Sequence, residues 1–155
     1  MSPRAGLLLT ATVGMGIVAG VFFAFSTFVM PALARLPPAQ GAAAMQVINV
    51  AAVNRWFMGA LFGSGLLALA LAATSLGALG EARSRWVLGG TAFYLAGVLA
   101  VTMFANVPRN DALAIMNADA AALYWPRYVA EWGGWNHVRT VTSIIATACF
   151  VLGRG

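Results

Sequence analysis

The sequence predicts an all-α integral membrane protein, a four-helix bundle with short amphipathic helices in two long loops on one face. Hydrophobic residues make up 61% of the 155 residues, and charged residues make up only 8%. A soluble domain is normally about 25% charged. This chain cannot cover itself with a polar surface, so the lipid bilayer is its expected solvent. The length fits a single domain over residues 1–155.

Runs of about 20 apolar residues define the expected membrane spans. The four runs cover residues 5–34, 56–79, 86–105 and 136–152. Pro31 is expected to kink or end the first span. That run is longer than the roughly 7–15 apolar residues of a signal-peptide core, which favours a span there. The pairs Gly16/Gly20 and Gly59/Gly63 have the spacing of small residues at close helix–helix contacts.

The connections between these runs are unequal in length. Residues 35–55 and 106–135 are long connections, whereas residues 80–85 form a short one. With four spans, both long connections lie on one side of the membrane, and the termini lie on the other with the short loop. Arginines near the span ends on the side of the termini favour a cytoplasmic location for it. All nine basic residues are arginine, which is typical of GC-rich bacterial genomes. We therefore expect a bacterial inner-membrane protein with cytoplasmic termini.

The long connections contain helix signals of their own. A short helix is expected over residues 42–53. A second is expected to begin at Asp111 as N-cap and to end before Pro126. A third is expected to begin at Pro126, with Arg127 and Glu131 paired four residues apart.

Charge and cysteine content exclude several classes of function. The net charge of +5 comes from arginines scattered singly among apolar runs, which argues against nucleic acid as a partner. Cys149 is the single cysteine, so an intrachain disulfide and a thiolate metal cluster are both excluded. Its place in an apolar run predicts a buried core residue.

Two polar clusters stand at the ends of apolar runs. They are Asn106–Asn110 (NVPRN) and Trp135–Thr140 (WNHVRT). Polar groups at such positions in a membrane protein are costly unless they are satisfied, so both clusters are candidate functional sites. The expected topology brings them to the same membrane face. Because the last apolar run is short, either the bilayer thins locally or the helix starts earlier. In the second case Asn136, His137 and Arg139 are expected to face protein groups or a hydrated pocket.

His137, the single histidine, is open to three interpretations. It is a structural residue at the interface, a general base that accepts a proton near neutral pH, or a haem or metal ligand. Arg139 either stabilises an oxyanion or enolate, or extends its charge to the membrane surface.

The asparagines are expected at the mouths of three spans. They are Asn49, Asn54, Asn106, Asn110 and Asn136. Each alone fits a helix cap, whereas together they fit a site that holds a phenol or carbonyl group through neutral amides. The series Asn136, Thr140, Ser143 and Thr147 forms one polar stripe on a helix. Its hydroxyls either bond to their own backbone or face a buried cavity.

An ordered set of motifs resembles a known family along nearly the whole chain. These motifs are Phe25-Ser26 with Val29–Leu33, Met45-Gln46 with Ile48-Asn49, Asn54, Asn106–Pro108 with Asn110, and Trp132 with Trp135–Thr140. The chain is similar to the anthrone oxygenases, small four-helix membrane proteins. Fungal members often have Asn-Pro where this chain has Asn54-Arg55.

The resemblance implies oxidation of an anthrone or a similar phenolic aromatic molecule by O2, without a recruited cofactor. On this hypothesis His137 removes a proton, Arg139 and the asparagines, Asn136 included, stabilise the anion, and Trp135 stacks on the rings. Phe25 and Ser26 are expected to contact the substrate. The expected partners are an aromatic substrate, O2, lipid and, in a homo-oligomer, further copies of the chain.

Two alternatives to an enzyme remain open. One is a haem- or quinone-binding membrane subunit that uses His137 as ligand. The other is a structural or assembly subunit in which the polar groups are only helix caps. No resident metal is otherwise expected, because the sequence lacks the Glu-x-x-His pairs of di-iron bundles.

Overall fold

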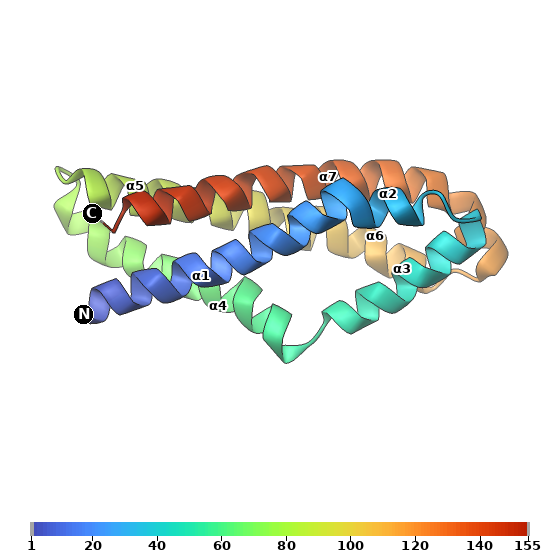
Figure 1. Cartoon of the computed structure of the whole chain (residues 1–155), viewed down its shortest axis with the longest axis horizontal. Helices are drawn as coiled ribbons and strands as arrows, with labels where there is room; N and C mark the ends of the chain where they lie inside the picture. The colour runs from blue at the N-terminus through green and yellow to red at the C-terminus, as the bar shows by residue number, and fades with distance from the viewer. Residues whose placement is uncertain (1, 155) are drawn as a thin grey trace.

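The computed structural model describes residues 2–154, and every element in that range is helical (Figure 1). The elements in chain order are α1 (Pro3–Ala24), η1 (Phe25–Val29), α2 (Met30–Leu33), α3 (Pro38–Ala52), α4 (Arg55–Ser75), η2 (Leu76–Ala78), α5 (Ala82–Ala92), η3 (Phe93–Ala100), η4 (Thr102–Asn106), α6 (Val107–Ala114) and α7 (Ala118–Leu152). The prediction of an all-α chain is confirmed.

Within residues 2–154, three continuous helical stretches are long and apolar enough to cross a membrane. They are Pro3–Leu33, Arg55–Ala78 and Ala82–Ala114, and they contain the first three expected spans almost entirely. The fourth expected span, residues 136–152, is the C-terminal half of α7 and is not one of the three. Its first residues include Asn136, His137 and Arg139, which lower the hydropathy of that half of the helix.

The long helices pack side by side. α1 contacts α4 and α7, and α5 contacts the same two helices. Both termini lie at one end of the molecule, where the α4–α5 connection also lies, whereas α2, α3 and the start of α7 lie at the other end (Figure 1). Buried residues form one cluster around Met15, Tyr94 and Phe150 and a second around Met45 and Tyr128. The second cluster lies at the end where the long connections fold back, and it positions the candidate site.

Both helices in the long connections differ from their predicted boundaries. α3 begins at Pro38, four residues before the expected start, because proline suits the first turn of a helix. Asp111 lies inside α6, so the prediction that it is an N-cap is wrong. The next helix, α7, has Asn117 as its N-cap. Asn117 Oδ1 accepts a hydrogen bond from the backbone N–H of Ala120 at 3.0 Å.

Pro126 lies inside α7, so the prediction that one helix ends and another begins there is wrong. Proline removes one backbone donor and normally kinks or breaks a helix. Here Trp125, Tyr128 and Trp132 on both sides of it are buried in the same cluster. We attribute the continuity of α7 to this packing. The expected Arg127–Glu131 pair is confirmed, with 2.7 Å between Nε and Oε1.

Two of the π-helical turns, η1 and η4, contain the residue four positions before a proline. Pro31 neither ends nor breaks the first helical stretch, which passes through η1 before α2. The proline ring conflicts with the carbonyl four residues earlier, here that of Thr27 inside η1, and a wider turn accommodates it. Pro108 follows η4 in the same way.

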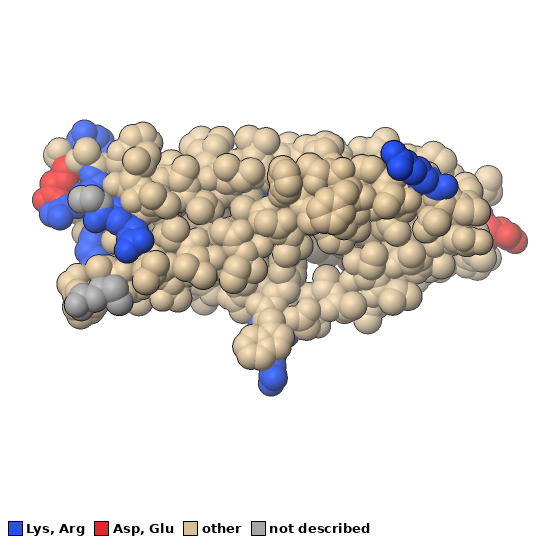
Figure 2. All heavy atoms as spheres, in the orientation of Figure 1, with Lys and Arg blue, Asp and Glu red and all other residues tan. Residues whose placement is uncertain are grey.

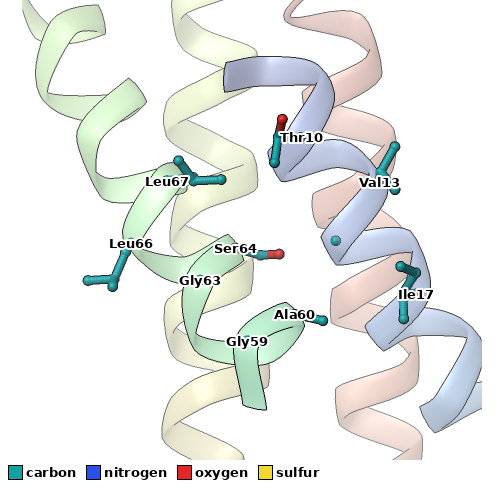
Figure 3. A pocket seen from close by; sticks show the side chains of 10 residues that line it. Thr10, Val13, Ile17, Gly59, Ala60, Gly63, Ser64, Leu66 and Leu67 are labelled. Atoms are coloured by element: carbon teal, nitrogen blue, oxygen red, sulfur yellow. The ribbon is translucent and has the colours of Figure 1, made fainter. Parts of the chain in front are cut away.

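The predicted close contacts of the paired glycines are not found in the part of the chain that the structure describes. A Cβ atom at Gly16, Gly20, Gly59 or Gly63 would meet nothing within 4 Å. Gly59 and Gly63 instead line an open groove between α4 and α1, with Thr10, Val13 and Ile17 on the facing helix (Figure 3). Close approach occurs elsewhere: a Cβ at Gly14 would lie 2.2 Å from Ser64 Oγ, and one at Gly97 would lie 2.4 Å from Thr142.

Candidate functional site

A cavity of about 170 Å³ lies where α1, η1, α3, α4 and α7 meet η4 and α6. Most of its lining is apolar or aromatic, including Phe22, Phe25, Phe57 and Trp132. Its polar lining residues are Asn49, Thr102, Asn110 and Arg139. An apolar cavity with a few convergent polar groups is the usual form of a ligand site, although this one is below the roughly 300–1,000 Å³ of typical ligand pockets.

Arg139 is buried, with 5% of its surface exposed. Its Nη2 donates to Asn136 Oδ1 at 2.9 Å, and its Nη1 donates to Thr102 Oγ1 at 3.3 Å. Its Nε has no hydrogen-bond partner. The guanidinium carbon lies 4.2 Å from the centroid of the Phe22 ring and 5.1 Å from that of Trp132. Aromatic faces and neutral oxygens surround this charge, and within residues 2–154 no carboxylate forms an ion pair with it.

Asn136 holds Arg139 against the first helix. Its Nδ2 donates to the Phe22 carbonyl and to Ser26 Oγ, both at 2.8 Å. The Ser26 hydroxyl also lies 2.9 Å from Thr140 Oγ1. Asn136 is in the middle of α7, so the expectation that it opens a helix is wrong. It is a fully buried link between η1, the end of α1 and the guanidinium.

A second polar group lies at the cavity on the side of the long connections. Tyr128 Oη donates to Asn110 Oδ1 at 2.7 Å and accepts from Asn49 Nδ2 at 3.4 Å. Both asparagines line the cavity, whereas Tyr128 is fully buried behind them. This contact joins α3, α6 and α7.

Asn106 is buried beside the cavity without lining it. Its Nδ2 donates to the Trp132 carbonyl at 3.1 Å, so it joins η4 to α7. Asn106 Oδ1 and the indole Nε1 of Trp132 have no hydrogen-bond partner. With Arg139 Nε, they are three of the four buried polar side-chain atoms that have no partner within residues 2–154, and the fourth is Trp125 Nε1. The three lie on Trp132 or on a residue that contacts it.

His137, Trp135 and Asn54 lie outside the cavity. His137 is exposed and lines a separate outer groove of about 310 Å³ with Phe25, Ser26 and Met30. Trp135 is 41% exposed. Asn54 is exposed and caps α4, since its Oδ1 accepts from the N–H groups of Trp56 and Phe57 at 3.0 Å.

The structure therefore divides the predicted site residues into three groups. Phe25, Asn49, Asn110 and Arg139 line one cavity. Ser26, Asn106 and Asn136 support it through hydrogen bonds. His137, Trp135 and Asn54 face elsewhere. The polar stripe below Asn136 bonds mainly to its own backbone, as Ser143 to Thr140 and Thr147 to Ser143.

Four residues of the site are not among the predicted site residues: Phe22, Thr102 and Trp132 in the cavity wall and Tyr128 behind it. Of these, Trp132 belongs to the motifs that resemble the family. Phe22 and Thr102 lie inside apolar runs, where nothing in the sequence separates them from lipid-facing residues. Tyr128 lies beyond Pro126, in a segment that was expected to be a separate short helix. One signal was present, because Tyr128, Trp132 and Arg139 share a helical face once α7 is read as continuous.

The groove beside His137 offers no cluster of metal ligands. Within residues 2–154, no group of three or more His, Cys, Asp or Glu side chains is placed to hold a metal ion. Cys149 is buried, as expected, and lies in the core at the other end of α7.

Comparison with known proteins gives one match. A family model described as "Anthrone oxygenase" matches residues 50–149, well over half of the chain. The matched range contains Asn54, Asn106, Asn110, Tyr128 and the whole Trp135–Thr140 cluster, and it excludes Phe25, Ser26 and Asn49. Searches of curated proteins and of solved structures gave no significant match.

Proposed function

Because the chain belongs to the anthrone oxygenase family, we propose that it oxidises an anthrone or a similar phenolic polycyclic aromatic molecule with O2 in the cavity beside Arg139. The main support is the guanidinium of Arg139, which is buried, lines the cavity and, among residues 2–154, forms no ion pair with a carboxylate. A buried charge is costly unless it is paired. A ligand anion in the cavity would supply the missing partner.

Arg139 favours the ionised form of such a ligand. A phenol or enol oxygen beside the guanidinium loses its proton more readily, because charge interactions are strong in a site from which water is excluded. Thr102 and Asn136 hold the guanidinium in place, so little reorganisation is needed. The faces of Phe22 and Trp132 are available to contact flat rings.

The oxidation then follows from the electron-rich anion. The anion transfers an electron to O2, and the resulting radical pair combines to form a carbon–oxygen bond. Loss of the remaining C–H proton with cleavage of the O–O bond leaves a ketone and releases water. In total one CH2 group and one O2 give one C=O group and one H2O. All electrons come from the substrate, so this proposal needs no recruited cofactor.

His137 does not line the cavity, so its role as general base stays a prediction that requires the ligand to reach the outer groove. We favour loss of the proton to water at the cavity mouth. The absorption spectrum of the purified protein distinguishes the haem-binding alternative from the cofactor-free oxidation. A Soret band that disappears in His137→Ala would contradict the cofactor-free reaction.

We infer that the C-terminal half of α7 is a fourth span and completes a four-helix bundle. It packs against α1, α5 and η3. Its outer face exposes Val141, Ile144, Val151 and Leu152, as expected for contact with lipid. On the face shown in Figure 2, single charged side chains lie at the lower edge near the middle and toward the far end, whereas charged side chains gather at the end with the termini. The arginines there favour a cytoplasmic location for the termini.

The proposed function is tested by O2 consumption of the purified protein with an anthrone as substrate. Loss of a preorganised charge-stabilising group typically lowers the rate about 100-fold to 1,000-fold. We expect a decrease of this order in kcat/KM for Arg139→Met. The matched control is Arg127→Met, an exposed arginine of the same helix, which should retain the rate. Unchanged oxidation by a folded Arg139→Met protein would overturn the proposal.

A further inference from the structure

The cavity has a polar group at each end of one face of α7. Tyr128 and Arg139 are eleven residues apart on this helix, which is close to three full turns, so their side chains point in the same direction. At about 1.5 Å per residue, their backbones are about 16 Å apart along the axis. The side chains are closer, because the Arg139 guanidinium carbon lies 5.1 Å from the Trp132 ring centroid and the Tyr128 ring centroid lies 6.2 Å from it. Trp132 lies between them and lines the apolar wall. A ligand that extends along this face meets a cation at one end and two amides at the other.

The hydrogen bonds of Tyr128 determine which atoms of Asn49 and Asn110 are left to bind a ligand. A tyrosine hydroxyl has one proton to donate. It donates to Asn110 Oδ1 at 2.7 Å and accepts from Asn49 Nδ2 at 3.4 Å. The carbonyl oxygen of Asn49 and the amide N–H groups of Asn110 are therefore left for a ligand. This end of the cavity offers one acceptor and one donor.

The surroundings of Tyr128 prevent its phenol from turning. The ring is fully buried and lies between Trp125 and Trp132, with centroid distances of 5.6 and 6.2 Å and interplanar angles of 14° and 18°. Burial also raises the pKa of Tyr128, which keeps the hydroxyl protonated as a donor. Packing thus fixes where the Tyr128 hydroxyl oxygen lies, and its contacts with Asn110 and Asn49 give the hydrogen-bond chain its direction.

We propose that Tyr128 determines the ligand specificity of the cavity, by orienting Asn49 and Asn110 to receive a neutral phenolic hydroxyl while Arg139 receives an anionic oxygen. The ligand class is a flat aromatic molecule with a hydroxyl at each end. A hydroxyl can both donate to Asn49 and accept from Asn110, whereas an ether or a carbonyl can only accept and leaves the Asn49 oxygen unpaired. Asn49 is half-buried, and a ligand in the cavity would cover its oxygen. A polar group that is left unpaired beneath the wrong ligand disfavours binding of that ligand. This inference rests on the proposed function, and Tyr128 acts as a positioning residue.

The test uses two ligands that cannot be oxidised further at the central ring. One is anthraflavic acid, a flat three-ring quinone with one hydroxyl at each end, and the other is the same quinone with a single hydroxyl. Their dissociation constants are measured by quenching of tryptophan fluorescence in the purified full-length protein. We expect the protein to prefer anthraflavic acid about tenfold, as one satisfied hydrogen bond permits. In Tyr128→Phe the preference should fall to within about twofold.

The matched control is Tyr124→Phe, a half-buried tyrosine one turn earlier whose ring contacts Tyr128. It should keep the full preference. Asn110→Leu removes both the partner of Tyr128 and the donor in the cavity, so it should also lose the preference for anthraflavic acid. This variant replaces Tyr128→Phe in the test if Tyr128→Phe fails to fold. A ratio, unlike an affinity, does not change when a variant is only less stable.

The possible results separate this inference from the proposed function. Equal binding of the two ligands by the unaltered protein, or a preference retained in folded Tyr128→Phe and Asn110→Leu proteins, overturns the role of Tyr128 but leaves the Arg139 site standing. Absence of binding for both ligands, or binding that is unchanged in Arg139→Met, overturns the anion site and this inference with it.

Discussion

At the scale of single residues, the sequence points to His137 as the main functional side chain, whereas the structure places Arg139 and not His137 in the cavity. His137 is the single histidine and the obvious candidate for a proton acceptor. It lies on an exposed groove, whereas Arg139, two residues later, is buried against Phe22 and Trp132. Two positions in a helix differ by about 200° in direction. That rotation places one residue of the motif in the cavity and the other outside it.

The placement of His137 leads to the first prediction. His137→Ala should retain at least about half of the kcat/KM for anthrone oxidation, because the side chain does not line the cavity. The measurement is O2 uptake at neutral pH, beside the inactive Arg139→Met variant. A loss of activity similar to that of Arg139→Met would show instead that the reaction uses the outer groove.

The charge of Arg139 can be cancelled without altering Arg139 itself. Thr102 accepts a hydrogen bond from its Nη1 and lines the cavity. Thr102→Asp should place a carboxylate beside the guanidinium and lower the affinity for a phenolate ligand at least about tenfold. Thr102→Asn is the isosteric neutral control and should bind almost normally. Equal affinities of the two variants would argue against an anion site. The measurement is ligand titration by fluorescence.

At the scale of the elements, close approach of helices depends on a few glycines that sequence spacing does not identify. Gly97 in η3 faces Thr142 of α7, whereas Gly89 on α5 faces open space. Gly97→Ala should destabilise the protein by about 1–3 kcal/mol, because the new methyl group overlaps α7. Gly89→Ala should be neutral or stabilising by up to about 1 kcal/mol, because alanine favours the helix. Thermal unfolding in detergent measures both, and equal melting temperatures would contradict the close packing of η3 on α7.

Glu131 pairs with Arg127 on its own helix and with Arg109 of α6, so we expect the stability of α7 and of its contact with α6 to depend on pH. Arg127, with Arg109, holds the pKa of the Glu131 carboxyl below its usual range. A group whose pKa is lowered by folding stabilises the protein above its unfolded pKa, about 4.3, and this contribution is lost as pH falls through the folded pKa. Glu131→Gln should therefore lower the melting temperature at pH 7, and the difference from the unaltered protein should disappear in acid. A difference independent of pH would exclude this origin.

At the scale of the whole molecule, the positions of the termini and of the charged residues predict the membrane orientation. Within a Cys149→Ala background, Gly80→Cys in the α4–α5 connection should react with a membrane-impermeant maleimide only after the membrane is opened. Leu123→Cys, an exposed position near the start of α7, should react in intact cells. The reverse pattern would place the termini outside the cytoplasm. Labelling of both sites in intact cells would contradict the four-span arrangement.

The amino-acid sequence by itself determined the class of the fold and the chemical character of the site. A chain with so few charges and such long apolar runs has to be helical in a bilayer, because every backbone polar group there must be satisfied within its own segment. The sequence also predicted five site residues, because a polar side chain at the end of an apolar run is costly unless it is satisfied. They are Asn49, Asn106, Asn110, Asn136 and Arg139. These properties depend on composition and local order alone.

The tertiary structure decided which of these residues share a cavity. Pro126 in the sequence predicts the end of a helix. In the structure, burial of Trp125 and Tyr128 on both sides of it keeps α7 continuous. That continuity puts Tyr128, Trp132 and Arg139 on one face, and it turns His137 away. Local signals cannot report this outcome, because it depends on side chains of α3, η1 and α6 that come into contact only when the long connections fold back onto the bundle.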